Sequence, residues 1–338
     1  MMYRRFCSIA VLGILAYASP VGAQTLTEQL NRPAASVEPV DSLRSIADRD
    51  FRLGREQQAA GQLEAAIGAW QQAALGYQQL QDFSALGRVY EYLSSAYMQL
   101  GRSTEAEDAL RRRLAIARDT QDVQGQVFGL NGLGTLLLAR GNAAGAQILW
   151  LEANRIAQTI GDPAGQGLAL SNLGLISLQQ GQLEEAIKQF EVAIGFLRRT
   201  NESASEASTR NSLGDAYRAA NQTRDALRSY LSALSLAEFR GDRSNQFRAI
   251  DGLVAVYSQL GQPRAALDLL RDRLELAQQN PRQQLNTARL LAEFFVQMGD
   301  RNQATLYFQR AIAIAQQLED TQQEGLLINR QASLGLTP

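Results

Sequence analysis

The feature that most constrains this chain is a repeat with a period of 40 residues. The phrase GQLEEAIKQF at 181–190 nearly copies GQLEAAIGAW at 61–70. Turn-forming residues recur with this spacing, apart from a last step of 38 residues, at Gly61, Gly101, Gly141, Gly181, Asn221, Gly261 and Gly299. A fixed period of this length indicates stacked repeats, in which one supersecondary unit occurs many times.

Each unit is predicted to be two helices joined at this turn. Before the turn, apolar residues follow helical spacing, as Leu130, Leu133 and Leu137 do. Five residues after each turn stands an alanine, and four residues later a large residue: Trp70, Leu110, Trp150, Phe190, Tyr230, Leu270 and Phe308. The small residue lets the helices approach, and the large one fills the space between them. One hairpin cannot bury its apolar face alone, so neighbouring hairpins must stack.

The ends of the predicted helices carry their own signals. An aspartate precedes most units and can accept hydrogen bonds from the free N–H groups of a helix start; these residues are Asp82, Asp122, Asp162, Asp242 and Asp320. Pro163 follows Asp162 at the favoured first helical position. Asn221 replaces glycine at one turn, as expected for a left-handed residue at a helix end.

These residues resemble the tetratricopeptide repeat. The resemblance rests on the turn residue, the alanine and large residue after it, and Leu-Gly pairs such as Leu133-Gly134, Leu173-Gly174 and Leu213-Gly214, with Tyr97, Tyr217 and Tyr257 three residues after that glycine place. The period exceeds the family's usual length of about 34 residues and is similar to the extended repeat of kinesin light chain. Ser94, Val254 and Ala292 depart from the pattern at the glycine place, and the family's proline between units is mostly missing. The resemblance implies an all-α, right-handed α-solenoid of about seven hairpins with a C-terminal capping helix.

The chain divides into four predicted segments: a signal peptide at 1–23, a flexible lead-in at 24–45, seven repeats at 46–321, and a capping helix and tail at 322–338. Arg4 and Arg5 precede an apolar run at 6–18, and Val21 and Ala23 fit the small-residue rule for cleavage. The run is shorter than the roughly 20 residues that span a bilayer. We therefore expect export, to a periplasm or to the thylakoid lumen of a photosynthetic source, without stable membrane insertion after cleavage. An uncleaved N-terminal anchor is the alternative.

Composition argues against most catalytic chemistry. The chain has no histidine, and its one cysteine, Cys7, lies inside the apolar run. The commonest general base and metal ligand is therefore missing. We expect no catalytic residues, no metal site and no cofactor; an enzyme would have to work with carboxylates, serine or tyrosine. A net charge of −1 argues against nucleic acid as a partner.

Members of the resembled family bind peptides or partner helices on a concave wall lined by first helices. Each unit has a leucine taken as its core anchor: Leu53, Leu93, Leu133, Leu173, Leu213, Leu253 and Leu291. At about 100° per residue, positions two and five residues to either side of an anchor point away from the core, and so does Asn172 beside its anchor. The selected groove residues are Phe128, Asn131, Leu168, Asn172, Leu175, Asn211, Asp215, Arg218, Arg248 and Asp251.

The sequence thus predicts an apolar groove floor for hydrophobic side chains of a protein or peptide partner. The flanking amides and arginines would bond the partner's backbone or acidic groups. Three alternatives stay open. Phe128 and Leu168 are ordinary core residues, Asp215 and Arg218 form a helix-surface ion pair, or the repeats serve self-association into a homo-oligomeric assembly. The run Arg111 to Arg113 is expected on a solvated outer face.

Overall fold

The computed structural model describes residues 40–200 and 202–336, and every regular element within these ranges is helical. The predicted signal peptide, with Cys7, and the lead-in up to residue 39 lie outside the described residues. The first helix begins at Val40, six residues before the predicted boundary between lead-in and repeats.

Seven hairpins and a last single helix follow one another. The hairpins are α2 (Val40–Ala59) with α3 (Leu63–Gln79), α4 (Phe83–Gln99) with α5 (Ser103–Asp119), α6 (Val123–Ala139) with α7 (Ala143–Ile160), α8 (Pro163–Gln179) with α9 (Leu183–Leu197), α10 (Ser203–Ala219) with α11 (Thr223–Arg240), α12 (Arg243–Gln259) with α13 (Pro263–Leu276), and α14 (Pro281–Gln297) with α15 (Arg301–Gln317). The single helix is α16 (Thr321–Ser333), which packs on α15 as a cap. The predicted α-solenoid of seven hairpins is confirmed.

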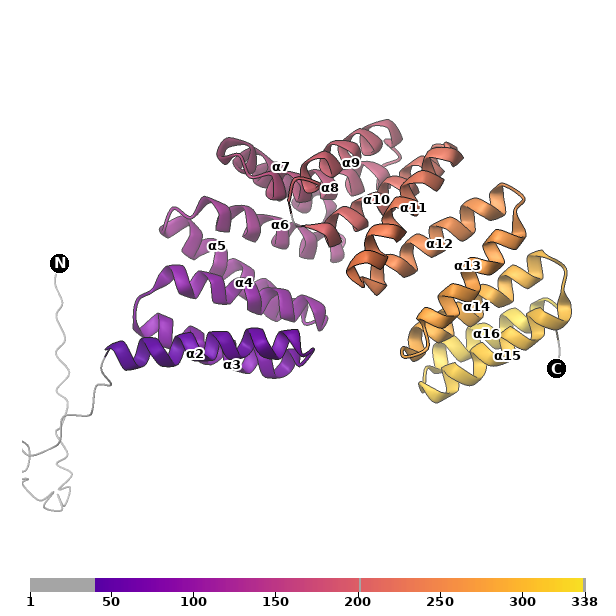
Figure 1. Cartoon of the computed structure of the whole chain (residues 1–338), viewed down its shortest axis with the longest axis horizontal. Coiled ribbons are helices and arrows are strands. Elements are labelled where there is room, and N and C mark those ends of the chain that lie inside the picture. The colour runs from indigo at the N-terminus through magenta and orange to yellow at the C-terminus, as the bar shows by residue number, and fades with distance from the viewer. Residues whose placement is uncertain (1–39, 201, 337–338) are drawn as a thin grey trace, which may run out of the picture.

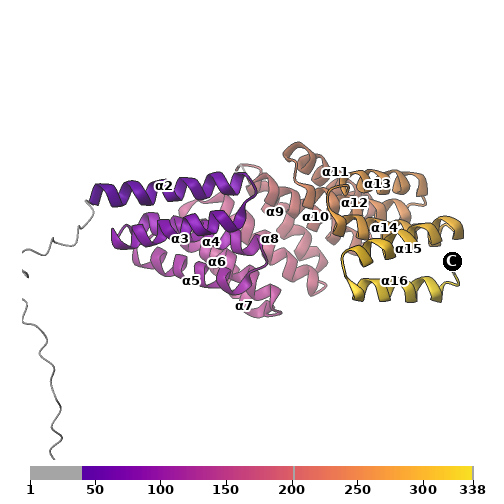
Figure 2. The ribbon, with the colours of Figure 1, turned by 90° about the horizontal axis from the view of Figure 1, so that it is seen from below.

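The hairpins are arranged along an open arch, with α2 near one end and α16 near the other (Figure 1). First helices of successive hairpins contact one another, α6 with α8, α8 with α10 and α10 with α12. No two second helices in the described chain make contacts of comparable extent. The first helices therefore lie on the shorter, concave side of the arch, and the second helices lie on the convex side. Figure 2 turns the ribbon to view the arch from its open side.

The predicted helix ends are confirmed. Each of the five aspartates accepts a hydrogen bond from the backbone N–H three residues further on, as Asp82 does from Ala85. Pro163 is the first residue of α8. Asn221 has φ 58° and takes the left-handed conformation that the glycines adopt at the other hairpin turns. Asparagine enters this region more easily than most residues, which is why it can replace glycine here.

Within a hairpin, the two helices meet where a small residue faces a large one. A Cβ atom added at Gly134 would lie 2.4 Å from Trp150, and one at Gly174 would lie 2.6 Å from Phe190. Gly54 and Gly214 stand in the same relation to Trp70 and Tyr230. The three departures from glycine occur in units with other large residues: Ser94 and Val254 are matched with leucines, and Ala292 with Phe308. The exceptions in the Leu-Gly pattern thus follow mainly from the size of the opposing side chain.

The leucine anchors pack against the second helix of the preceding hairpin. Leu213 clusters with Phe190, and Leu253 clusters with Tyr230. The prediction is wrong for Leu53, whose residue surface is 42% exposed. Leu53 belongs to α2, and no hairpin precedes α2 in the described chain to cover it.

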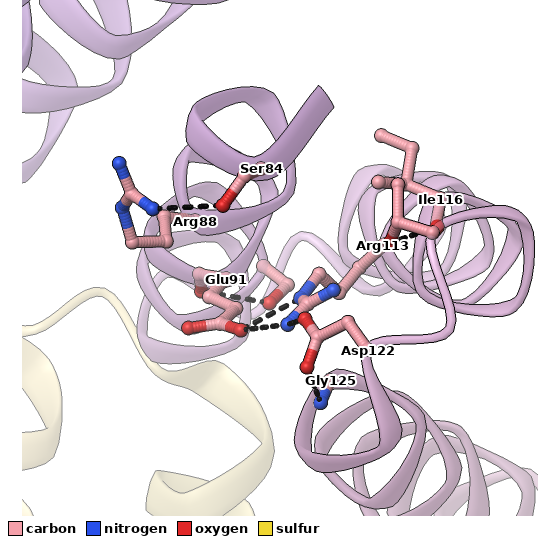
Figure 3. Close-up of polar contacts among 9 residues, drawn as sticks. Ser84, Arg88, Glu91, Arg113, Ile116, Asp122 and Gly125 are labelled. Atoms are coloured by element: carbon pink, nitrogen blue, oxygen red, sulfur yellow. Dashed lines mark hydrogen bonds and ion pairs between the residues drawn. The ribbon is translucent and has the colours of Figure 1, made fainter. Parts of the chain in front are cut away.

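The expectation of a solvated arginine run is wrong for its last member. Arg113 is 4% exposed. Its Nε donates to Glu91 on α4 at 2.6 Å, and its Nη2 donates to the N-cap residue Asp122 at 2.5 Å (Figure 3). Gly125 makes room, because a Cβ there would lie 1.9 Å from the guanidinium. Burial acts to raise the pKa of Asp122, but the Gly125 amide and Arg113 outweigh it, and the pKa lies below its ordinary value.

The same arrangement recurs four units later. Arg273 on α13 is 3% exposed and donates to Asp251 at 2.6 Å, with the same 22-residue separation as Arg113 and Glu91. The other units carry alanine at the place of this arginine: Ala73, Ala153, Ala193, Ala233 and Ala311. A buried arginine thus occurs only where the first helix offers a carboxylate at the matching position.

These and other polar contacts connect successive hairpins unevenly. Arg113 joins the second hairpin to the third, and Ser171 joins the fourth to the fifth through Thr209 at 2.9 Å. Between the third and fourth hairpins, the described residues form no ion pair. Their one side-chain hydrogen bond there is a 3.5 Å contact from Gln166 to the carbonyl of Ala157. Apolar packing dominates this joint.

Substitution of Gly134 tests the packing within a hairpin. We expect Gly134→Ala to lower the free energy of unfolding by about 1–3 kcal/mol, because the methyl group would overlap Trp150. Urea unfolding followed by circular dichroism measures the change. Gly68→Ala in α3 is the matched control, since a Cβ there meets nothing within 4 Å, and it should stabilise by about 0.5–1 kcal/mol. Equal effects at the two sites would contradict this account.

A double-mutant cycle tests the buried arginine. Arg113→Ala should lower the free energy of unfolding by about 2–3 kcal/mol, because it leaves Glu91 and Asp122 without their cation. Adding Glu91→Asn recreates the Asn131 and Ala153 combination of the third hairpin and should restore part of the loss. Additive effects in urea unfolding would show that the pair is not coupled.

Candidate partner-binding groove

The ten predicted groove residues lie on four successive first helices, α6, α8, α10 and α12, along the concave side of the arch. They differ in exposure. Phe128, Leu168, Asn172, Leu175, Asp215 and Arg248 are half-buried, and Arg218 and Asp251 are exposed. Asn131 and Asn211 are buried. The structure thus gathers these residues on one wall, although two of them are nearly covered.

The apolar residues of this wall also belong to the core. Phe128 packs against the cluster that includes Leu93 and Leu136, and Leu175 packs against the cluster around Phe190. Each nevertheless keeps part of its surface accessible. The core interpretation therefore holds for one side of Phe128 and Leu175, while the other side remains available at the concave surface.

The polar residues of the fifth and sixth hairpins form a network. Arg248 on α12 donates to Asp215 on α10 at 2.8 Å and to Ser212 at 3.0 Å. The Tyr230 hydroxyl donates to the other oxygen of Asp215 at 2.6 Å. Burial, together with the charge of Asp215, raises the pKa of Tyr230 well above its usual range. The ion-pair partner of Asp215 is thus Arg248 in the next hairpin, rather than Arg218 three residues away.

Asp251 is occupied in a similar way. Its two oxygens accept from Nε and Nη2 of Arg273 at 2.6 and 3.2 Å, and Arg273 also lies 4.9 Å from the ring centre of Phe247. Asp251 and Asp215 therefore hold hairpins together, so that of the charged groove residues Arg218 is the most accessible to a partner.

The two buried asparagines have unsatisfied polar atoms. Neither side-chain atom of Asn131 has a hydrogen-bond partner, and Asn211 donates to Asn245 at 3.2 Å while its Oδ1 is unpaired. On α10, Thr209 accepts the bond from Ser171, but the matching residue on α8 is Ala169. The next hairpin therefore offers no polar side chain at that position to Asn131. An unpaired buried amide lowers stability.

The concave wall continues beyond the predicted residues. A hollow of about 490 Å³ lies between α14 and α16, and its lining includes Asn286, Arg289, Glu293, Leu326 and Arg330. Arg330 donates to both oxygens of Glu293, at 2.8 and 2.9 Å, and these bonds lower the pKa of Glu293. The spacing rule applied to Leu291 points to residues 286, 289 and 293, so the signal for this region was present in the sequence.

Other classes of site were examined across residues 40–200 and 202–336. No group of three or more histidine, cysteine, aspartate or glutamate side chains in these ranges is arranged to hold a metal ion. Among the described helices, none is long and apolar enough to cross a membrane.

The fold defines the chain as an α-solenoid of helical hairpins, and sequence profiles identify the repeat. Profiles of the tetratricopeptide repeat match residues 166–238 and 205–279, and a second profile of the same repeat matches 83–124 and 287–322. The chain belongs to the tetratricopeptide-repeat family. No curated protein matches the sequence.

Several solved structures share the fold. One is a signal-transduction ATPase with a tetratricopeptide-repeat sensor from Pyrococcus horikoshii, with a TM-score of 0.60 and 17% identity over 85% of this chain and 45% of that chain. This chain thus spans about half the length of that protein. A tetratricopeptide repeat protein from Parabacteroides merdae matches with 0.52 and 13%, over 84% and 99%. A Rap protein complexed with competence and sporulation factor matches with 0.56 and 10%, over 88% and 98%.

The unpaired amide of Asn131 generates a prediction about stability. Asn131→Ala should raise the free energy of unfolding by about 1 kcal/mol, because it removes a buried polar group without partners and favours the helix. Asn211→Ala is the control and should be destabilising, because Asn211 bonds Asn245. Thermal and urea unfolding measure both. A loss of stability in Asn131→Ala would mean that its amide is satisfied in solution.

Proposed function

We propose that this chain is an exported, non-enzymatic scaffold that holds a segment of a protein partner in its concave groove. The observation that carries the proposal is the two-part character of the groove. Phe128, Leu168 and Leu175 present partly accessible apolar surface in the third and fourth hairpins, and polar or charged residues follow in the fifth and sixth. An extended or helical segment with hydrophobic and acidic residues fits such a wall.

The buried amides add support to this proposal. A scaffold that is best folded on its own has no reason to keep Asn131 unpaired, whereas a partner's backbone can both donate to and accept from an amide. A Rap protein of the same fold is known in complex with competence and sporulation factor, which shows that such an arch can hold another molecule.

Export rests on the predicted signal peptide at 1–23, and it places the scaffold in a periplasm or in the thylakoid lumen of a photosynthetic source. The absence of histidine from the whole chain supports a role without catalysis. Self-association into an envelope or luminal assembly is the alternative function, and the exposed Ile148 and Leu151 on the convex side favour it.

Affinity capture from a soluble extract of the exported compartment tests the groove. The bait is residues 24–338, and a second bait carries Asn172→Ala and Arg218→Ala, two groove positions that form no ion pair within the described chain. We expect a partner held by the first bait and lost from the second, because the substitutions remove polar contacts without disturbing the core. Circular dichroism confirms folding.

A convex-side variant, Glu184→Ala with Lys188→Ala on the exposed surface of α9, is the matched control and should keep the partner. Equal capture by all three baits would remove the selected groove residues from the proposal. Capture of the chain alone, with a mass that rises with concentration, would favour the assembly alternative.

A further inference from the structure

A second apolar groove lies on the opposite side of the arch. It is a hollow of about 390 Å³ between the second helices α5 and α7, with α6 behind it, and we call it the α5–α7 groove. Its floor consists of leucines from all three helices: Leu114, Leu133, Leu136, Leu137 and Leu149. Because second helices form the convex side, a molecule bound here would not enter the concave groove.

The outer edge of this groove is apolar as well. Ile148 and Leu151 on α7 are 65% and 53% exposed. They are three residues apart and therefore share one face of the helix. The matching positions on the neighbouring second helices carry charges: Asp108 and Arg111 on α5, Lys188 and Glu191 on α9, and Asp268 and Arg271 on α13. The convex face of α7 thus departs from its neighbours by exposing two large aliphatic side chains.

Arginines surround the leucine floor. Glu107 is shared by Arg111, at 2.7 Å, and by Arg140, and Glu152 lies 3.7 Å from Arg118. Arg155, four residues after Leu151, is exposed and forms no ion pair within the described chain. Four arginines therefore face two glutamates around this groove, although the whole chain has a net charge of −1.

We propose that the α5–α7 groove is a docking site for an amphipathic helix of a protein partner with acidic residues beside its apolar stripe. The leucine floor and the Ile148 and Leu151 edge would bury that stripe. The surplus arginines would pair with the acidic flanks. A second copy of this chain complements the site poorly, because a symmetric contact sets the two arginine rims against each other.

A synthetic helix tests the proposal with the full chain. The probe is a fluorescent peptide as long as α7, 18 residues, with leucines spaced by three and four, glutamates beside them and alanines elsewhere. A second peptide replaces every glutamate with lysine. Fluorescence anisotropy gives both dissociation constants. We expect the glutamate peptide to bind about tenfold or more tightly than the lysine peptide, with a preference that weakens as salt is added.

Variants locate the binding. Ile148→Ser with Leu151→Ser should weaken the glutamate peptide by about tenfold or more, because both apolar contacts are lost. Arg228→Ser with Leu231→Ser changes the matching positions on α11 and should leave binding unchanged. The groove variant Asn172→Ala with Arg218→Ala should also bind normally, so that this proposal and the concave-groove proposal can fail separately.

Each other outcome overturns the proposal. Equal binding of the two peptides would remove the acidic specificity, and equal losses in the α7 and α11 variants would remove the location. Concentration-dependent mass abolished by the Ile148 and Leu151 substitutions, without peptide binding, would identify a second copy as the occupant. Binding to phosphatidylserine–phosphatidylcholine vesicles, abolished in the same way and without peptide binding, would identify a membrane surface.

Discussion

The size match between the two helices of each hairpin is the constraint on which the arch depends. Trp150 fits only because Gly134 has no side chain, and the same holds for Phe190 with Gly174. A close crossing of this kind brings the backbone within reach of polar groups, and Trp150 donates to the carbonyl of Asn131 at 3.1 Å. The crossing sets the angle inside each hairpin, and stacking of near-identical hairpins then turns that local angle into the curvature of the whole chain.

Curvature divides the surface into two walls with different roles. The concave wall is crowded, so its side chains reach across hairpins and meet, as Arg248 meets Asp215. Second helices stand further apart on the convex side, and a groove with a leucine floor forms between α5 and α7. The two proposed binding surfaces therefore share α6, which contributes Phe128 to one side and Leu137 to the other. A scaffold built in this way can hold two partners back to back.

The parts that the sequence predicted correctly are those fixed by local chemistry. The hairpin turns, the aspartate caps and the left-handed Asn221 depend on residues within one turn of helix. The wrong predictions depended on a neighbouring unit. Leu53 lacks a preceding hairpin, and Arg113 is buried because Glu91 and Asp122 lie on other helices. The recurrence of the acid–arginine pair at 22 residues, in Asp251 and Arg273, was the available signal. Nothing local could assign Asp215 to Arg248 rather than to Arg218.

The uneven distribution of polar contacts between hairpins has a mechanical consequence. Hydrogen bonds are directional and resist rotation, whereas apolar surfaces slide over one another at little cost. The joint between the third and fourth hairpins, with the unpaired Asn131 and the long Gln166 contact, is therefore the most compliant place in the arch. The two flanking halves act as comparatively stiff arms, so the opening of the concave side can widen or narrow by bending at this joint, in the manner of a spring clip.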